Sequence, residues 1–204
     1  MGLTFIASRT ADEPGTGSGE ATLGFTSGID DTYNEYQFYF VNIHPDTQVT
    51  THPNFQFQVN AITSADPPVQ LEGFDENMTT TGFYAYNRNT SGASDLTYGA
   101  TEDQAGTDAI YQNILAYDIT NVDRGSVSGV LTLYDPSSIT YIKHFTSVGQ
   151  GIAYGNAPGV GSGSYAVNMW NAGYINTTNA ITQISFKFDD GDIDAGTIYM
   201  YGVS

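Results

Sequence analysis

Apolar and polar residues alternate through much of the chain with a period of two. The clearest segment is NFQFQVNAI at residues 54–62. The apolar positions in this segment are Phe55, Phe57, Val59 and Ala61. The polar positions between them are Gln56, Gln58 and Asn60. This pattern predicts a β-strand with one buried and one solvated face, which is typical of antiparallel sheets.

The same reasoning predicts strands in LTFIAS, ATLGFTSGI, EYQFYFVNI, GFYAYNRN, SVSGVLTLYDP, ITYIKHFTSV, YAVNMWNAGYI, AITQISFKF and GTIYMYGV. Residues 109–119 fit a helix or a strand by periodicity, and their β-branched and aromatic surroundings favour a strand. Residues 97–108 are expected to form a polar loop. With turn signals such as Asp135-Pro136 and Asp190-Gly191 between the strands, we expect an all-β chain of about ten strands. The predicted fold is one antiparallel two-sheet β-sandwich of jelly-roll type over residues 1–204.

The charge balance restricts the partners of this protein. Lysine and arginine number 5 and aspartate and glutamate 22, so the net charge is −17. Such a chain is expected to repel nucleic acid and anionic membrane surfaces. It has no cysteine, which excludes disulfides and thiolate metal sites. Its start does not resemble a Sec signal peptide, and no stretch approaches 18 apolar residues.

Aspartates gather near the C-terminus, in the sequence DDGDIDAG. Asp190, Asp192 and Asp194 supply oxygen ligands of the kind that Ca²⁺ prefers, so they are a candidate calcium site. The spacing is not that of an EF-hand, because Ala195 stands where the turn glycine is required. We favour the alternative, in which Asp190-Gly191 is the tight turn of a hairpin between two strands, and we expect no cofactor.

Other reactive groups show no catalytic pattern. No nucleophile elbow, P-loop or dinucleotide-binding motif is present. His44 and His52 lie near Asp46 but each precedes a proline, so we expect a solvated loop. A set of carboxylates could serve glycoside hydrolysis, although a solvated acidic surface is the favoured interpretation: Glu72, Asp75, Glu76, Glu102 and Asp103. We therefore predict no catalytic residues and no enzyme activity.

Aromatic side chains are the remaining signal. Trp170, with Tyr165 and Tyr174, could stack on sugar rings as a glycan platform. Alternation places Trp170 and Tyr165 on opposite faces of their strand. We favour a place in the core for Trp170.

Four blocks of the chain resemble virion proteins of tailed bacteriophages, especially those of marine and freshwater bacteria such as cyanobacteria. They are FTSGIDDTYNEYQFYFVNIHPDT, NFQFQVNAI, LYDPSSITYIKHFTS and GYINTTNAITQISFKFDDGDIDAGTIYMYGV, at residues 25–47, 54–62, 133–147 and 173–203. The ending G-T-I-x-x-Y-G is the most specific block, and it carries no catalytic residue.

The resemblance implies a structural protein on the exterior of the phage particle, either a capsid-decorating (cement) module or a tail fibre-like, tail-attached module. We expect it to form a homo-oligomer, with a trimer as the guess, and to contact other virion proteins. The alternative is a receptor-binding tip that recognises host surface polysaccharide through the loops at 63–82, 97–109 and 150–164. An acidic glycosidase or depolymerase is a third, less favoured reading.

Overall fold

The structure is a computed structural model, and it describes residues 2–12, 19–46, 53–63, 69–71, 73–88, 92–100, 102–106, 109–115, 119, 125–153 and 165–204. All regular elements in these ranges are β-strands. The strands are β1 (Leu3–Asp12), β2 (Leu23–Phe25), β3 (Glu35–Pro45), β4 (Phe55–Ala61), β5 (Met78–Arg88), β6 (Ser94–Tyr98), β7 (Gln112–Leu115), β8 (Val127–Tyr134), β9 (Lys143–Ala153), β10 (Tyr165–Ile175), β11 (Ile181–Phe188) and β12 (Ile193–Val203). In this part of the chain no helix exists that could cross a membrane.

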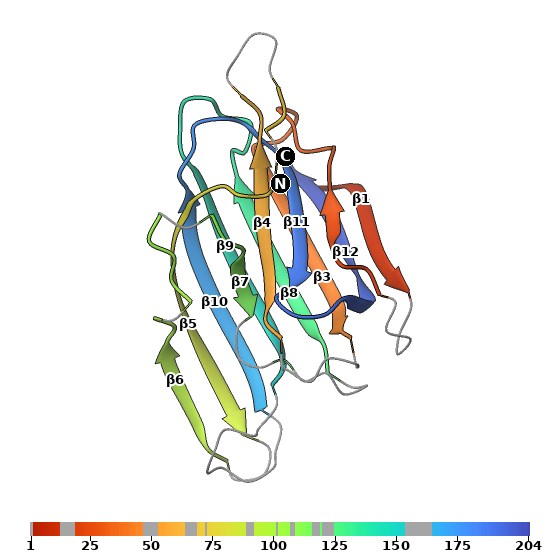
Figure 1. Cartoon of the computed structure of the whole chain (residues 1–204), viewed down its shortest axis with the longest axis vertical. Coiled ribbons are helices and arrows are strands. Elements are labelled where there is room, and N and C mark those ends of the chain that lie inside the picture. Colours follow the sequence, from red (N-terminus) through yellow and green to blue (C-terminus); the bar gives the residue numbers. More distant parts are fainter. Residues whose placement is uncertain are drawn as a thin grey trace.

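The strands form two antiparallel sheets that pack face to face, so the predicted β-sandwich is confirmed (Figure 1). The larger sheet has eight strands in the order β1-β12-β3-β8-β9-β10-β5-β6. The smaller has four, in the order β2-β11-β4-β7. The expected strand at residues 109–119 exists as β7, whereas β6 occupies part of the predicted polar loop.

The strand order shows how the chain is wound. Without β5, β6, β9 and β10, the order β1-β12-β3-β8 faces β2-β11-β4-β7, and the chain crosses repeatedly between the sheets. This is the connectivity of an eight-stranded jelly roll. The β5–β6 and β9–β10 hairpins are additions that widen one sheet. They join through eleven consecutive pairs between β10 and β5, from Tyr165↔Arg88 to Ile175↔Met78.

The predicted C-terminal hairpin is wrong. β11 pairs with β2 and β4, whereas β12 pairs with β1 and β3 in the other sheet. The turn at Asp190-Gly191 therefore carries the chain from one sheet to the other. Gly191 still supplies a positive φ of 74°. Asp189 anchors the turn, because its carboxylate accepts hydrogen bonds from the backbone N and side-chain Nδ2 of Asn54 at 2.8 and 2.9 Å.

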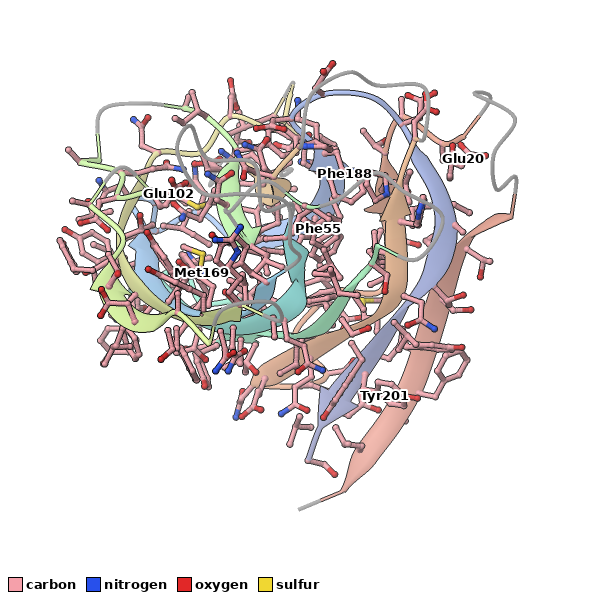
Figure 2. The ribbon with its side chains drawn as sticks, turned by 90° about the horizontal axis from the view of Figure 1, so that it is seen from below. Glu20, Phe55, Glu102, Met169, Phe188 and Tyr201 are labelled. Atoms are coloured by element: carbon pink, nitrogen blue, oxygen red, sulfur yellow. The ribbon has the colours of Figure 1, made fainter. Side chains whose placement is uncertain are left out.

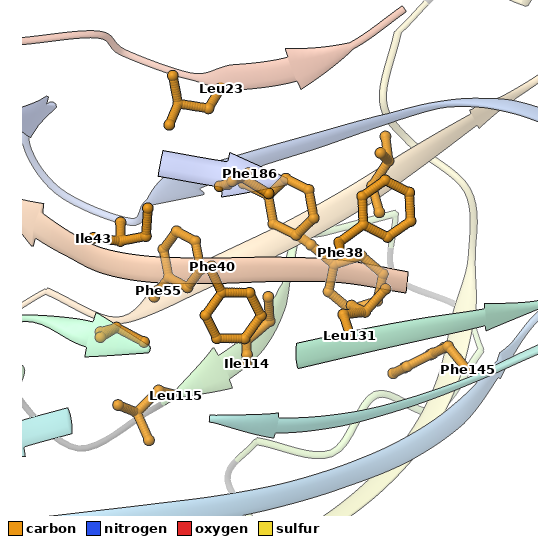
Figure 3. Packing of buried hydrophobic residues seen from close by; sticks show 14 of the residues in the cluster. Leu23, Phe38, Phe40, Ile43, Phe55, Ile114, Leu115, Leu131, Phe145 and Phe186 are labelled. Carbon is orange, nitrogen blue, oxygen red and sulfur yellow. The ribbon is translucent and has the colours of Figure 1, made fainter. Parts of the chain in front are cut away.

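The core lies between the two sheets and is rich in phenylalanine (Figure 3). Phe38 and Phe186 pack across the sandwich with their ring centroids 5.7 Å apart, and Phe57 and Phe145 do so at 4.9 Å. The apolar face predicted for residues 54–62 is buried as expected. Burial of such side chains at roughly 1.5–3 kcal/mol each is the main favourable contribution to folding.

The opposite face of residues 54–62 is not fully solvated, contrary to expectation. Gln58 and Asn60 are buried because neighbouring loop segments cover them. The Nε2 group of Gln58 donates to the carbonyls of Glu76 and Ile110, and the Nδ2 group of Asn60 donates to the carbonyl of Leu71. These bonds satisfy the amide NH2 groups, which would otherwise be costly to bury, whereas the Oδ1 atom of Asn60 is buried without a hydrogen-bond partner.

The large sheet curves around the small one. Figure 2 shows Phe55, Phe188 and Met169 on the inner, concave side of this curve, while other side chains project from the convex side. All strands of the small sheet pack on the concave side, so the convex outer face of the large sheet is not covered by any described strand.

Candidate functional site

The outer face of the large sheet carries an aromatic and aliphatic row of directly paired residues. The row crosses all eight strands through Ser8, Tyr199, Tyr39, Val130, Val148, Trp170, Phe83 and Tyr98. None of these side chains is charged, although the chain has 22 acidic residues. An uncharged stripe on an acidic molecule is the strongest surface feature among the described residues.

Trp170 lies in this row and not in the core, so its predicted position is wrong. The inner face of β10 is formed by the other parity of residues, including Val167 and Met169. The indole of Trp170 stacks on the ring of Phe83, with centroids 5.1 Å apart and planes 16° from parallel. The two residues are direct cross-strand partners, and such aromatic pairs stabilise a sheet by about 0.5–1.5 kcal/mol.

Tyr98 continues the aromatic row on the edge strand β6. Phe83 and Tyr98 are 44% and 60% exposed, which is high for aromatic side chains. The Tyr98 hydroxyl donates to the carboxylate of Asp103 and accepts from the Thr81 hydroxyl at 3.4 Å. These contacts hold the phenol over the outer face. Tyr98 could not be recognised from the sequence, because SDLTY is too short to show alternation.

Three hollows follow β10 along this face. The middle one has a volume of about 310 Å³ and lies beside Trp170, Phe83 and Tyr98, over the small side chain of Ala172. A hollow of about 370 Å³ follows towards Tyr174, and one of about 420 Å³ lies on the other side, over Ala166. We call this line of hollows the β10 groove. It exists because two of the outward residues of the strand are alanines, Ala166 and Ala172, next to larger side chains such as Trp170 and Tyr174.

The three residues of the predicted aromatic platform do not all lie on one face of the sheet. Trp170 and Tyr174 both face outward along the β10 groove, and Tyr174 contacts His144 at 6.4 Å between ring centroids. Tyr165 is buried on the inner face, where it packs against Tyr86 at 5.5 Å. The residues that complete the outer surface are instead Phe83 and Tyr98, which come from β5 and β6.

The three candidate calcium ligands lie at different depths. Asp190 is exposed, Asp192 is half-buried and Asp194 is fully buried. Within the described ranges, no group of three or more histidine, aspartate or glutamate side chains is arranged to hold a metal ion. His44 is part of β3 and not of a loop, while His52 lies outside the described residues.

Two of the candidate acidic residues are engaged in hydrogen bonds with neighbouring side chains. Glu102 accepts a hydrogen bond from Asn113, and Asp103 accepts one from Tyr98. Glu76 is half-buried, and this burial, with a smaller contribution from Asp75, raises the pKa of its carboxyl. Glu72 lies outside the described residues.

Lys143 is a buried group that the sequence did not single out. Its side chain has no exposed surface, and its Nζ donates to the carbonyl of Thr177 at 3.3 Å. Burial lowers the pKa of Lys143 to about 8, against an opposing attraction from Asp135 and Glu76. No single residue in its sequence context, YIKHF, marks it as buried.

Comparison with known proteins adds no relative: no family model, no curated protein and no solved structure matches the chain.

Proposed function

We propose that this chain is a non-enzymatic structural protein of a tailed-bacteriophage virion, displayed on the particle exterior as a capsid-decorating or tail-attached module. The resemblance of residues 25–47, 54–62, 133–147 and 173–203 to such proteins supports this proposal. In the fold, these blocks contain β3, β4, β11, β12 and the β8–β9 turn, which belong to the jelly-roll part of the sandwich.

The observation that carries the proposal is the apolar edge of the large sheet. β1 is a ten-residue strand at the end of the sheet order, paired only with β12 among the described strands. Its Leu3 and Phe5 are 53% and 55% exposed. A long edge strand with exposed apolar side chains favours pairing with another chain unless something covers it.

Aromatic rings extend this edge onto the outer face. The ring of Phe5 meets that of Tyr201 at 5.7 Å, and Tyr201 meets Tyr39 at 5.6 Å, both nearly edge to face. We call these residues with Leu3 the β1 surface. Aromatic residues are enriched at protein–protein interfaces, because they bury a large area with few rotatable bonds.

A second exposed apolar group lies on the β8–β9 turn. Ile139, Tyr141 and Ile142 all project into solvent, at the end of the sandwich where Tyr134 aligns with Glu35. Two separate apolar surfaces suit a chain that contacts two neighbours, one a copy of itself and one another virion protein. The acidic remainder of the surface would keep whole particles soluble and apart.

The test is the mass of the full chain in solution, measured by size exclusion with light scattering over a range of concentrations. We expect a defined oligomer, with three copies as the proposed number. The double variant Leu3→Lys/Phe5→Lys should shift the mass towards the monomer, because it places two charges in the β1 surface. Leu96→Lys, on the opposite edge strand β6, is the matched control and should leave the mass unchanged. A protein that stays monomeric at all concentrations would contradict the proposal.

A further inference from the structure

We propose that the β10 groove is a binding site for an uncharged, extended oligosaccharide, with Trp170, Phe83 and Tyr98 as its stacking surface. This inference goes beyond the proposed function, because the ligand is not a subunit of the particle. It also uses the half of the outer face that is farthest from the β1 surface.

The shape of the groove suits a linear ligand. The middle hollow and the hollow of about 370 Å³ share Thr81, Thr146 and Ala172 as lining residues. The hollow of about 420 Å³ is separate and follows further along the same strand, at Asn168 and Ala166. Trp170 and Tyr174 are four residues apart on one strand, which corresponds to about 13 Å. A chain of several sugar rings, lying along the strand, would contact all three hollows.

The chemistry of the middle hollow suits the apolar face of a sugar ring. Phe83 is 44% exposed and Trp170 is half-buried, so part of the stacked pair stays accessible to a ligand. Tyr98 stands beside Phe83 with its hydroxyl fixed by Asp103, which reduces the entropy lost on binding. Binding sites for small molecules typically combine such apolar walls with a few placed polar groups.

The polar groups around the groove are mainly hydroxyls and amides. Thr81 and Thr146 line the middle hollow, and Gln150 and Asn168 line the hollow of about 420 Å³. Carboxylates lie at the rim, namely Asp95 beside the latter hollow and Asp103 behind Tyr98. These groups can donate to and accept from the hydroxyls of a saccharide.

Charge decides between neutral and anionic ligands. Among the residues that the structure describes, no lysine or arginine lines the three hollows, and His144 is the one basic side chain there. The hollows therefore offer no permanent positive charge to pair with a phosphate, sulfate or carboxylate. The net charge of −17 would repel a polyanion before contact. An acidic polysaccharide or a nucleic acid is therefore a poor fit, and a neutral glycan is favoured.

The chain carries its own reporter for this site, because Trp170 is its only tryptophan. The experiment titrates the full-length protein with neutral linear hexasaccharides of β-1,4-glucose, β-1,3-glucose and α-1,6-mannose while following tryptophan emission. Oligogalacturonate is the anionic comparison. We expect a saturable change with at least one neutral glycan and none with oligogalacturonate.

Variants locate the binding site. Ala172→Phe fills the middle hollow but keeps Trp170, and Phe83→Ala removes the stacking partner; each should weaken the affinity about tenfold or more. Tyr199→Ala removes an aromatic ring from the same row on β12 and should leave binding unchanged. Circular dichroism checks that each variant folds, and Ala172→Phe is informative because Ala172 is exposed.

Three results would overturn the inference. The first is the absence of any response to the neutral panel. The second is a response that Ala172→Phe and Phe83→Ala do not weaken. The third is an emission shift that follows protein concentration without sugar, which would mean that a second copy covers the groove. The first two leave the light-scattering test of the proposed function untouched, so the two proposals can fail separately.

Discussion

The buried side chain of Lys143 makes the stability of this sandwich depend on pH. It is the first residue of β9 and lies inside the fold, where burial lowers its pKa to about 8 from an ordinary value of 10.5. Because the folded pKa lies below the unfolded one, the unfolded chain binds the extra proton between pH 8 and 10.5. This group therefore makes the fold less stable below pH 8, and its contribution improves as the pH rises through that window.

We predict that Lys143→Met stabilises the protein at pH 7 by about 1–3 kcal/mol, because a similar volume is buried without a charge. The advantage of the variant should shrink between pH 7 and 9.5, since the wild-type lysine becomes neutral in the fold. Urea unfolding of both proteins across this range measures the difference. The tyrosines also titrate at high pH, but they contribute equally to both proteins, so their effect cancels in the difference between the two free energies of unfolding. If the free energies of unfolding of the two proteins changed with pH in parallel, Lys143 would have an ordinary pKa in the fold.

Single residues also mark the limits of prediction from sequence. Alternation correctly grouped the residues of β10 into two faces, but it could not say which face meets the small sheet. We expected Trp170 in the core because a tryptophan in such a strand is more often buried than exposed, whereas the buried residues of β10 include Val167 and Met169. The burial of Gln58 and Asn60 was missed because it depends on segments outside the strand, which cover these side chains only in the folded chain.

At the scale of elements, the widening of the jelly roll depends on the pairing of β5 with β10. Gly82 faces Asn171 in this pairing, and a Cβ at Gly82 would lie 2.5 Å from the Oδ1 atom of Asn171. Asn171 is buried, and its Nδ2 donates to the carbonyl of Ile114 at 3.0 Å and to the Ser147 hydroxyl at 3.3 Å. The side chain of Asn171 thus links β10 to β7 and β9. It fits there because Gly82, on the neighbouring strand, has no side chain to occupy the same space.

We predict that Gly82→Ala lowers the free energy of unfolding by about 1–3 kcal/mol, because the methyl group displaces Asn171 from its hydrogen bonds. Gly24→Ala in β2 is the matched control, since a Cβ there would lie at 3.7 Å from the carbonyl of Ile184, an ordinary contact. Guanidinium unfolding of both variants gives the comparison. Equal stabilities for the two would show that Asn171 can move without cost.

The type of nearly every element followed from periodicity, while the pairing did not. Strands such as β3 and β4 alternate over most of their length, so their type and inner face were readable. The last two strands are adjacent in sequence, joined by Asp-Gly, and so looked like a hairpin. They enter different sheets because β12 pairs with β1 and β3, and contacts over such sequence separations leave no local pattern.

At the scale of the whole molecule, the two faces of the large sheet have different roles. Its concave face contributes to one continuous core, which includes Met78 and Met169 from the added strands as well as Phe38 and Phe186 from the jelly roll. No described strand covers its convex face, which has the β1 surface at one end and the β10 groove at the other. Under the two proposals, the protein would act through the shape and the exposed aromatic area of this face.

The candidate site was only partly visible before the fold was known. Trp170 and Tyr174 were noted as aromatic residues on one strand, and they do share a face. Phe83 and Tyr98 join them from strands that lie more than 70 residues earlier in the chain. Because the β5–β10 pairing creates the groove, its composition could be read only from the assembled sheet.

The most direct test of the account is amide hydrogen exchange of the full chain at low and high protein concentration, followed peptide by peptide. We predict that exchange in Leu3–Asp12 slows on concentration, as the β1 surface is covered by another copy, while Ser94–Tyr98 at the opposite edge is unchanged. Unchanged exchange in both strands, or slowing confined to β6, would contradict the account.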